Sequence, residues 1–372
     1  MVATTVPIPW YGILVTLLFF NRVEAYTDKQ FRHFYGSWDK DLYQIMELNC
    51  STLRNQLYEN PKQGGYELLQ CMLNYMGEAT KVEMGICTVI FGLLPSMMHM
   101  IGPEMQDVWR LGIHRPLLTL MLCIGAPTLT LSHGRTNQLD CYKKQPSVCV
   151  NTGACTTPNQ LWPSFLKHWT AGIAISLLEY LVAFGAAVSA LYYGYVLTFY
   201  CITFVTTLMG TFGSTQEAFA PLFWMLFPLP IHAMGIVAGY RSAIWKHPPQ
   251  LSNILDKVKH WIKGEITPCA YLMNYKDVTR LAPSYRSLVF DWVVKISVWV
   301  HVMSGTIILS STIFTNLFDT MRISGLLLGG TMLCRIIVAF ELYGLDMHRD
   351  PQAEVENADH CSIRTDGSAQ QS

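Results

Sequence analysis

Charge is scarce in this sequence. Only 14% of the 372 residues are Asp, Glu, Lys or Arg, whereas a soluble globular domain carries about 25%. The 26 basic and 26 acidic residues give zero net charge, so the chain has neither a basic field for nucleic acid nor an acidic bias. The composition therefore excludes nucleic acid as a leading partner and makes the lipid bilayer the expected surroundings of the chain.

Sequence motifs that carry catalytic chemistry are also missing. The sequence contains no Walker loop, His-Glu-x-x-His, Gly-x-Ser-x-Gly or Asp-Asp-x-x-Asp motif, which leaves an ATPase or hydrolase without residues to support it. We expect no metal site and no cofactor. The sequence identifies no small-molecule ligand.

What the sequence does contain is a series of long, uncharged apolar segments. Windows of about 20 residues predict an all-α polytopic transmembrane helix bundle of about seven spans. The first two windows correspond to only about 24 Å of helix each, against a hydrocarbon core of about 30 Å. This pair is therefore either extended by its flanks or re-entrant. The windows are 86–101, 116–131, 169–189, 194–212, 219–240, 288–312 and 323–343.

The side of the membrane on which each loop lies follows from the N-terminus and from loop charge. Residues 1–25 contain a short apolar run and then Val23-Glu24-Ala25, a pattern that fits either a cleaved signal peptide or an eighth span. Both alternatives place 26–85 outside the cytosol. The positive-inside rule agrees, because the 241–287 loop is rich in basic residues: Arg241, Lys246, Lys257, Lys259, Lys263, Lys276, Arg280 and Arg286.

This orientation predicts a division of the chain into domains. An extracytoplasmic segment (26–85) precedes a transmembrane bundle (86–344) with an outer loop at 132–168, and a disordered cytosolic tail (345–372) ends the chain. The expected location is the plasma membrane or the secretory pathway. The single glycosylation sequon, Asn49-Cys50-Ser51, falls in the segment placed outside.

Cysteine placement gives a further indication. Six cysteines are expected to meet an oxidising compartment, and six allow 15 pairings, among which the sequence does not choose. A disulfide-bonded outer loop is favoured over zinc or over unpaired thiols. The candidates are Cys50, Cys71, Cys87, Cys141, Cys149 and Cys155.

Only five charged residues fall inside the apolar windows, and ionisable groups at membrane depth mark either internal pairs or functional sites. Glu179 and Arg335 lie near the middle of their spans, so we expect them to pair. Asp291 and Lys295 are four residues apart on one helix face, with Glu341 at a comparable depth. Under the alternative interpretation, Glu179 or Asp291 is a catalytic acid or base.

Other intramembrane residues indicate packing. We expect His232 and His301 to form helix-to-helix hydrogen bonds. The spacing of Gly325 and Gly329 predicts the close approach of another helix there.

The basic loop contains one amphipathic segment. Its apolar residues Leu251, Ile254, Leu255, Val258, Trp261 and Ile262 share one helix face, between Pro248-Pro249 and Gly264. This pattern is typical of an interfacial helix. The helix packs under the bundle or binds a cytosolic partner within 241–287; both alternatives stay open.

Several short motifs stand out within about 66–131 and 160–241. They are Glu78, Lys81, Met84, Val89, Gly92-Leu93-Leu94-Pro95, Arg115-Pro116-Leu117-Leu118, Gly125-Ala126-Pro127, Trp224, Ile231-His232 and Arg241. Together they resemble the motifs of an uncharacterised family of fungal multi-pass integral membrane proteins. This resemblance implies a fungal secretory-pathway or plasma-membrane protein, without an assigned activity or catalytic residues.

The sequence therefore favours a non-enzymatic, receptor-like or scaffold membrane protein, because both faces have substantial loops and no catalytic constellation is visible. The first alternative is a membrane-embedded enzyme of fungal specialised-metabolite biosynthesis. A small-molecule transporter is the third.

Overall fold

The computed structural model describes residues 31, 34–59, 65–130, 169–198, 220–245, 254–268, 278–281 and 285–347. The described chain is almost entirely helical, as predicted. Its elements are α2 (Asp39–Asn49), α3 (Ser51–Glu59), α4 (Gly65–Tyr75), α5 (Glu78–Ile101), α6 (Met105–His114), α7 (Pro116–Gly125), α9 (Trp169–Val196), α10 (Ala220–Leu226), α11 (Pro228–Ser242), β1 (Ala243–Trp245), α12 (Ile254–Ile266), β2 (Val278–Leu281), α13 (Tyr285–Ser310) and α14 (Leu317–Met347).

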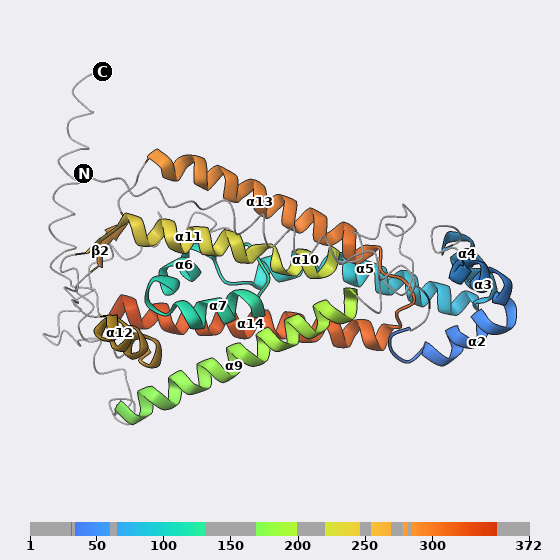
Figure 1. Cartoon of the computed structure of the whole chain (residues 1–372), viewed down its shortest axis with the longest axis horizontal. Coiled ribbons are helices and arrows are strands. Elements are labelled where there is room, and N and C mark those ends of the chain that lie inside the picture. Colours follow the sequence, from blue (N-terminus) through green and yellow to red (C-terminus); the bar gives the residue numbers. More distant parts are fainter. Residues whose placement is uncertain are drawn as a thin grey trace, which may run out of the picture.

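The described residues contain five helices that are long and apolar enough to cross a membrane: α5, α9, α10 with α11, α13 and α14. They extend along the long axis of the molecule (Figure 1). Large apolar side chains such as Leu177, Trp299 and Phe318 are exposed on their outer faces, as expected for surfaces that face lipid tails. Five candidate spans are thus present, and the seven predicted spans are not shown.

A small helical cap lies at one end of the bundle, on the right in Figure 1. Helices α2, α3 and α4 surround buried side chains that include Leu42, Met46 and Met72. The same cluster contains Met84 of α5 and Phe314, which lies between α13 and α14. The cap therefore packs directly on the ends of spanning helices.

The opposite end carries α12 and a two-stranded antiparallel sheet (Figure 1). In the sheet, Ala243 pairs with Leu281 and Ile244 with Arg280. The predicted basic loop 241–287 therefore starts at the end opposite the cap.

The first departure from the predicted topology is at α6 and α7. Each has ten residues, about 15 Å of helix, which is too short to cross about 30 Å of hydrocarbon. They form a hairpin, and the extended chain that follows returns to the bundle interior, where Thr130 bridges Glu104. Of the first pair of windows, only 86–101 belongs to a candidate span, α5, which its N-terminal flank extends. The window 116–131 belongs to the hairpin and the chain after it.

The second departure follows from the first. Helix α9 starts at the end opposite the cap and runs towards it (Figure 1), whereas the predicted topology started this helix on the side of the cap. The placement of 132–168 outside, together with Cys141, Cys149 and Cys155, rested on that topology and loses this support. These residues themselves lie outside the described part of the chain.

The third departure cancels the effect of the first on the direction of the later helices. The predicted span at 194–212 lies largely outside the described residues, but the N–H of Leu222 donates to Thr198 Oγ1 at 3.1 Å. The start of α10 is therefore beside the end of α9, and no net crossing separates them. Since one crossing is lost before α9 and another after it, α10 and all later helices run in the predicted directions relative to the cap.

Candidate functional site

A buried polar site is centred on Arg115, at the turn between α6 and α7. Arg115 is the residue before Pro116, and this position disfavours helical backbone; its φ of −130° and ψ of 70° separate the two helices. Its side chain is completely buried. A buried guanidinium needs compensating partners, because leaving it unpaired would be costly.

Two carboxylates face this guanidinium. Arg115 Nη1 lies 2.6 Å from Glu179 Oε2 of α9 and 2.9 Å from Glu341 Oε1 of α14. Both carboxylates are buried. Charge-assisted contacts of this length are stronger than neutral hydrogen bonds, so the hairpin is tied to two spanning helices at once.

The second terminal nitrogen of the guanidinium, Nη2, ties α12 to the same point. Arg115 Nη2 donates to Ser176 Oγ at 2.6 Å and to the backbone carbonyl of Glu265 at 2.9 Å. The carboxylate of Glu265 accepts the N–H of Leu117 at 2.7 Å and the hydroxyl of Tyr180. Arg115 Cζ also lies 5.4 Å from the centre of the Tyr180 ring, within cation–π range.

We call Arg115, Ser176, Glu179, Tyr180, Glu265 and Glu341 the arginine cluster. It joins four elements, α7, α9, α12 and α14, and contains more acidic than basic groups. Burial, and secondarily the charge of Arg110, lowers the pKa of the neighbouring His114 to about 4, so His114 adds no positive charge at neutral pH. Chemically, the cluster can lock these elements together.

The predicted pair of Glu179 and Arg335 is replaced in the structure. Glu179 contacts Arg115, while Arg335 Nη1 donates to the carbonyls of Met100 and Ile101 at the end of α5. Arg335 and Glu341 are six residues apart on α14, about 240° around the helix. They therefore face different neighbours, and only Glu341 reaches the arginine cluster.

Of the three other charges predicted inside spans, Glu341 belongs to this site. Lys295 is exposed on α13. Asp291 lies in α13, but its side chain is outside the described residues. We expected Glu341 at a depth comparable to that of Asp291 and Lys295. In the structure, Glu341 forms its ion pair with Arg115.

Sequence reasoning missed Arg115 and Glu265. Both lie outside the apolar windows, in segments assigned to aqueous loops. The available signal was the position of Arg115 directly before a short apolar helix, at a site already noted within the Arg115-Pro116 motif. Only the hairpin fold buries it.

Two intramembrane histidines bond to irregular backbone, and not to another helix as predicted. His232 Nε2 lies 3.1 Å from the Thr128 carbonyl, and His301 Nε2 lies 3.1 Å from the Pro127 carbonyl. Trp224 stacks on His301. These contacts satisfy non-helical carbonyls where no lipid could do so.

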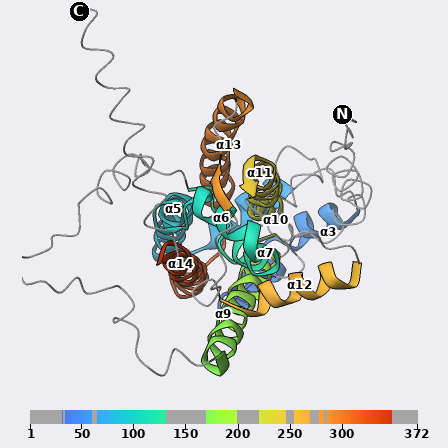
Figure 2. The same ribbon diagram turned by 90° about the vertical axis from the view of Figure 1, so that its left-hand side faces the viewer.

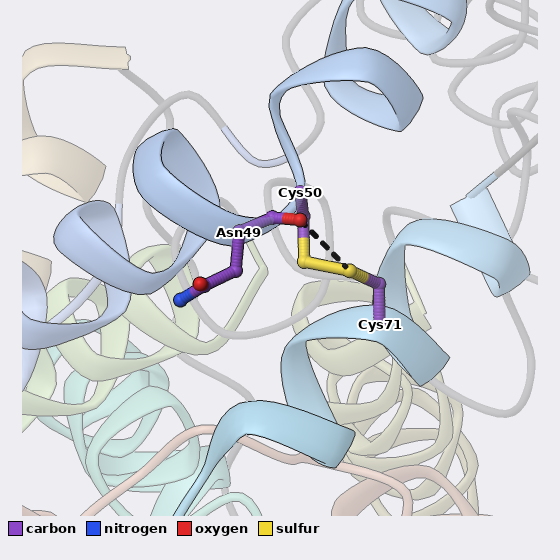
Figure 3. The surroundings of a disulfide bond; sticks show 3 residues. All are labelled: Asn49, Cys50 and Cys71. Carbon is purple, nitrogen blue, oxygen red and sulfur yellow. Dashed lines mark hydrogen bonds between the residues drawn. A yellow bond between two sulfur atoms is a disulfide. The ribbon is translucent and has the colours of Figure 1, made fainter.

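The cap contains the second predicted site. Cys50, at the junction of α2 and α3, is bonded to Cys71 of α4 (Figure 3). The side chain of Asn49 points away from this disulfide (Figure 3) and is exposed. Cys87 is a buried free thiol in α5 rather than a disulfide partner. Within the described part of the chain, no group of three or more His, Cys, Asp or Glu side chains is placed to hold a metal ion.

The five apolar helices and their exposed apolar faces define the chain as a multi-pass membrane protein. No family model, no curated protein and no solved structure matches it. The resemblance to a fungal family therefore stays an expectation from the quoted motifs.

Proposed function

We propose that this protein is receptor-like and couples its cap at one membrane face to α12 at the other. The proposal depends chiefly on the contacts of α14, which is a single helix of 31 residues with polar side chains bound near both ends. A continuous helix transmits displacement along its axis better than a loop does.

The start of α14 is bound to the cap. Asp319 is buried, and its Oδ2 accepts the N–H of Ser37 at 3.1 Å. Gly36, with a φ of 84°, leaves room for this carboxylate, because a Cβ there would overlap Asp319. Movement of the cap segment therefore acts directly on the first turn of α14.

The far end of α14 is bound to the arginine cluster. Glu341 lies 22 positions after Asp319, about 33 Å along the helix, and contacts Arg115 at 2.9 Å. Arg115 in turn binds the carbonyl of Glu265 in α12. A polar path thus leads from the cap through α14 to α12.

The proposed orientation places the cap outside and α12 in the cytosol. Three features favour it: the disulfide in the cap, the Asn49 sequon beside it, and the excess of basic residues in 241–287. The site of action is then the plasma membrane or the secretory pathway.

The test compares the hydrogen exchange of residues 254–266 between the purified full-length wild-type protein and the Asp319→Asn variant. This substitution removes the negative charge that accepts the N–H of Ser37, and the weakened cap contact should raise exchange in α12 several-fold. The matched control is Lys81→Met, which breaks the exposed pair of Lys81 and Glu78 at the start of α5 and should leave α12 unchanged. Glu341→Gln should abolish the effect of Asp319→Asn on α12, because it interrupts the path at its other end.

If Asp319→Asn changes hydrogen exchange only in the cap, the proposed coupling is wrong and a scaffold role is favoured.

The enzyme alternative gains little from the site, since Glu179 is held by Arg115. A transporter has one feature in its favour. The short α6–α7 pair and the break at Phe227 between α10 and α11 resemble the interrupted helices of transporter sites, but His301 and His232 already bind carbonyls freed by the irregular backbone.

A further inference from the structure

Helix α12 lies across the end of the bundle rather than along it. In Figure 2, which looks along the long axis of Figure 1, α12 is seen at full length beside α9 and extends away from the bundle. A helix with this direction at the end of a membrane-spanning bundle lies in the plane of the membrane.

The rotation of α12 about its own axis is fixed by Glu265. Its carboxylate is held by Leu117 and Tyr180, and its carbonyl by Arg115. Glu265 is buried, so the side of α12 that carries it faces the bundle. The directions of Val258, Trp261 and Ile262 follow from this anchor.

The apolar residues of α12 point the same way as Glu265. At about 100° per residue, Val258, Trp261 and Ile262 lie within about 60° of it around the helix. They are nevertheless 44%, 48% and 43% exposed. These three residues lie on the part of α12 that extends past the edge of the bundle. Their side chains therefore point towards the membrane, and no described part of the protein covers them.

This exposed face adjoins a surface that already faces lipid. The helix α9, which supplies Tyr180 to the anchor, exposes Leu177, Leu178 and Leu181 at the same level. A soluble protein would have to reach α12 from the aqueous side, where the exposed Lys259 lies about 120° from Glu265. The apolar face is thus continuous with the lipid-facing surface of the bundle.

We propose that α12 is a membrane-surface helix that inserts Val258, Trp261 and Ile262 between lipid chains and headgroups, and that it prefers anionic phospholipids. Trp is favoured at this depth. Lys257, Lys259 and Lys263 supply the charge that anionic headgroups attract. The proposal does not depend on a receptor-like role, because a scaffold or transporter could use the same helix.

The test uses full-length protein in nanodiscs of phosphatidylcholine alone or mixed with phosphatidylserine. A photoactivatable group in the lipid acyl chain should label residues 258–262, as mapped by mass spectrometry. Hydrogen exchange of 254–266 should be several-fold slower with phosphatidylserine, and high salt should remove this difference because it screens the lysines.

Two variants separate insertion from charge. Trp261→Glu should abolish the acyl-chain label on α12, whereas Lys259→Glu should keep the label and lose part of the phosphatidylserine effect. The matched control is Leu48→Glu, an equally drastic change at an exposed apolar side chain of the cap, which should alter neither result.

Absence of acyl-chain labelling from α12 in both lipid mixtures, with normal labelling of α9, would overturn the proposal. Protection of α12 that appears only when a soluble protein is added would also overturn it and would favour a protein partner. Equal labelling and equal exchange in both lipid mixtures would refute the preference for anionic lipid.

Discussion

Arg115 and Glu179 are 64 residues apart in the chain, yet their side chains form a buried ion pair at 2.6 Å. The pair joins the α6–α7 hairpin to the spanning helix α9. Glu341 faces the same guanidinium, so the two members of the pair are not equivalent. Removing the single cation leaves two buried carboxylates unmatched, whereas removing one anion leaves a matched pair.

This asymmetry predicts which substitution destabilises the protein more. Arg115→Gln should strongly lower the melting temperature and the yield of folded protein. Breaking a buried pair typically costs about 3–5 kcal/mol in soluble proteins when a charge is left alone. Glu179→Gln should cost clearly less, because Glu341 remains to balance Arg115. Thermal melting followed by size-exclusion chromatography in detergent measures both, and an equal loss in the two variants would contradict the asymmetry.

A double-mutant cycle distinguishes the observed partner of Glu179 from the expected one. Glu179→Gln and Arg335→Gln should have additive effects on stability, because Arg335 contacts carbonyls of α5 instead. Glu179→Gln combined with Arg115→Gln should be markedly non-additive. Strong coupling between Glu179 and Arg335, with none between Glu179 and Arg115, would show that the expected pairing was correct after all.

The failure of the expected pairing has a physical cause. Hydropathy located the apolar segments of all five candidate spans, because an uncharged run about 20 residues long is conspicuous. It could not separate a span from a short apolar helix that is buried in protein, and α7 is such a helix. Arg115 was therefore assigned to a loop, and Glu179 was matched to Arg335, the basic residue expected at the same depth.

The cap shows the same limit on a smaller scale. Sequence reasoning correctly included Cys50 and Cys71 among the oxidised cysteines, because both fall in the segment placed outside. It could not choose their pairing, since the distance between Cys50 and Cys71 depends on how α2, α3 and α4 fold. Cys87 was included because it lies near the start of its window, but the structure buries it in α5.

The disulfide gives the next prediction. Cys71→Ser opens a loop with a sequence separation of 21 and should destabilise the cap by about 3 kcal/mol on the chain-entropy model. Limited proteolysis should then cut the cap while the spanning helices stay resistant. Cys87→Ala is the control, since Cys87 forms no disulfide. Peptide mapping without reductant should recover Cys50 linked to Cys71; recovery of both as free thiols would contradict the structure.

The sequon gives a prediction about modification. Asn49 ends α2 with its side chain exposed, and under the proposed orientation it faces the lumen of the secretory pathway. Endoglycosidase treatment should shift the mobility of the wild-type protein but not of Asn49→Gln. Ser51→Ala should behave like Asn49→Gln, because the sequon needs its hydroxyl residue. An unshifted wild type would remove this support for the orientation, and the disulfide and loop charge would have to carry it alone.

The last prediction concerns where helices approach closely. The spacing of Gly325 and Gly329 predicted such an approach, but a Cβ at either position would meet nothing within 4 Å. Tight contacts lie elsewhere: for example, a Cβ at Gly235 of α11 would overlap the ring of Trp109 in α6. A four-residue spacing of small residues only permits a close contact, and the fold decides which glycine is used.

Gly235→Ala should therefore destabilise the protein by about 1–3 kcal/mol, the usual cost of overpacking a filled interior. Gly325→Ala is the matched control, with the same chemical change in another spanning helix. It should be neutral or stabilising by up to about 1 kcal/mol, because Ala favours helix more than Gly does. Thermal melting of the two variants in detergent compares them directly. The reverse order of stability would mean that α6 does not pack on α11 as described, and that the α14 glycines face a helix after all.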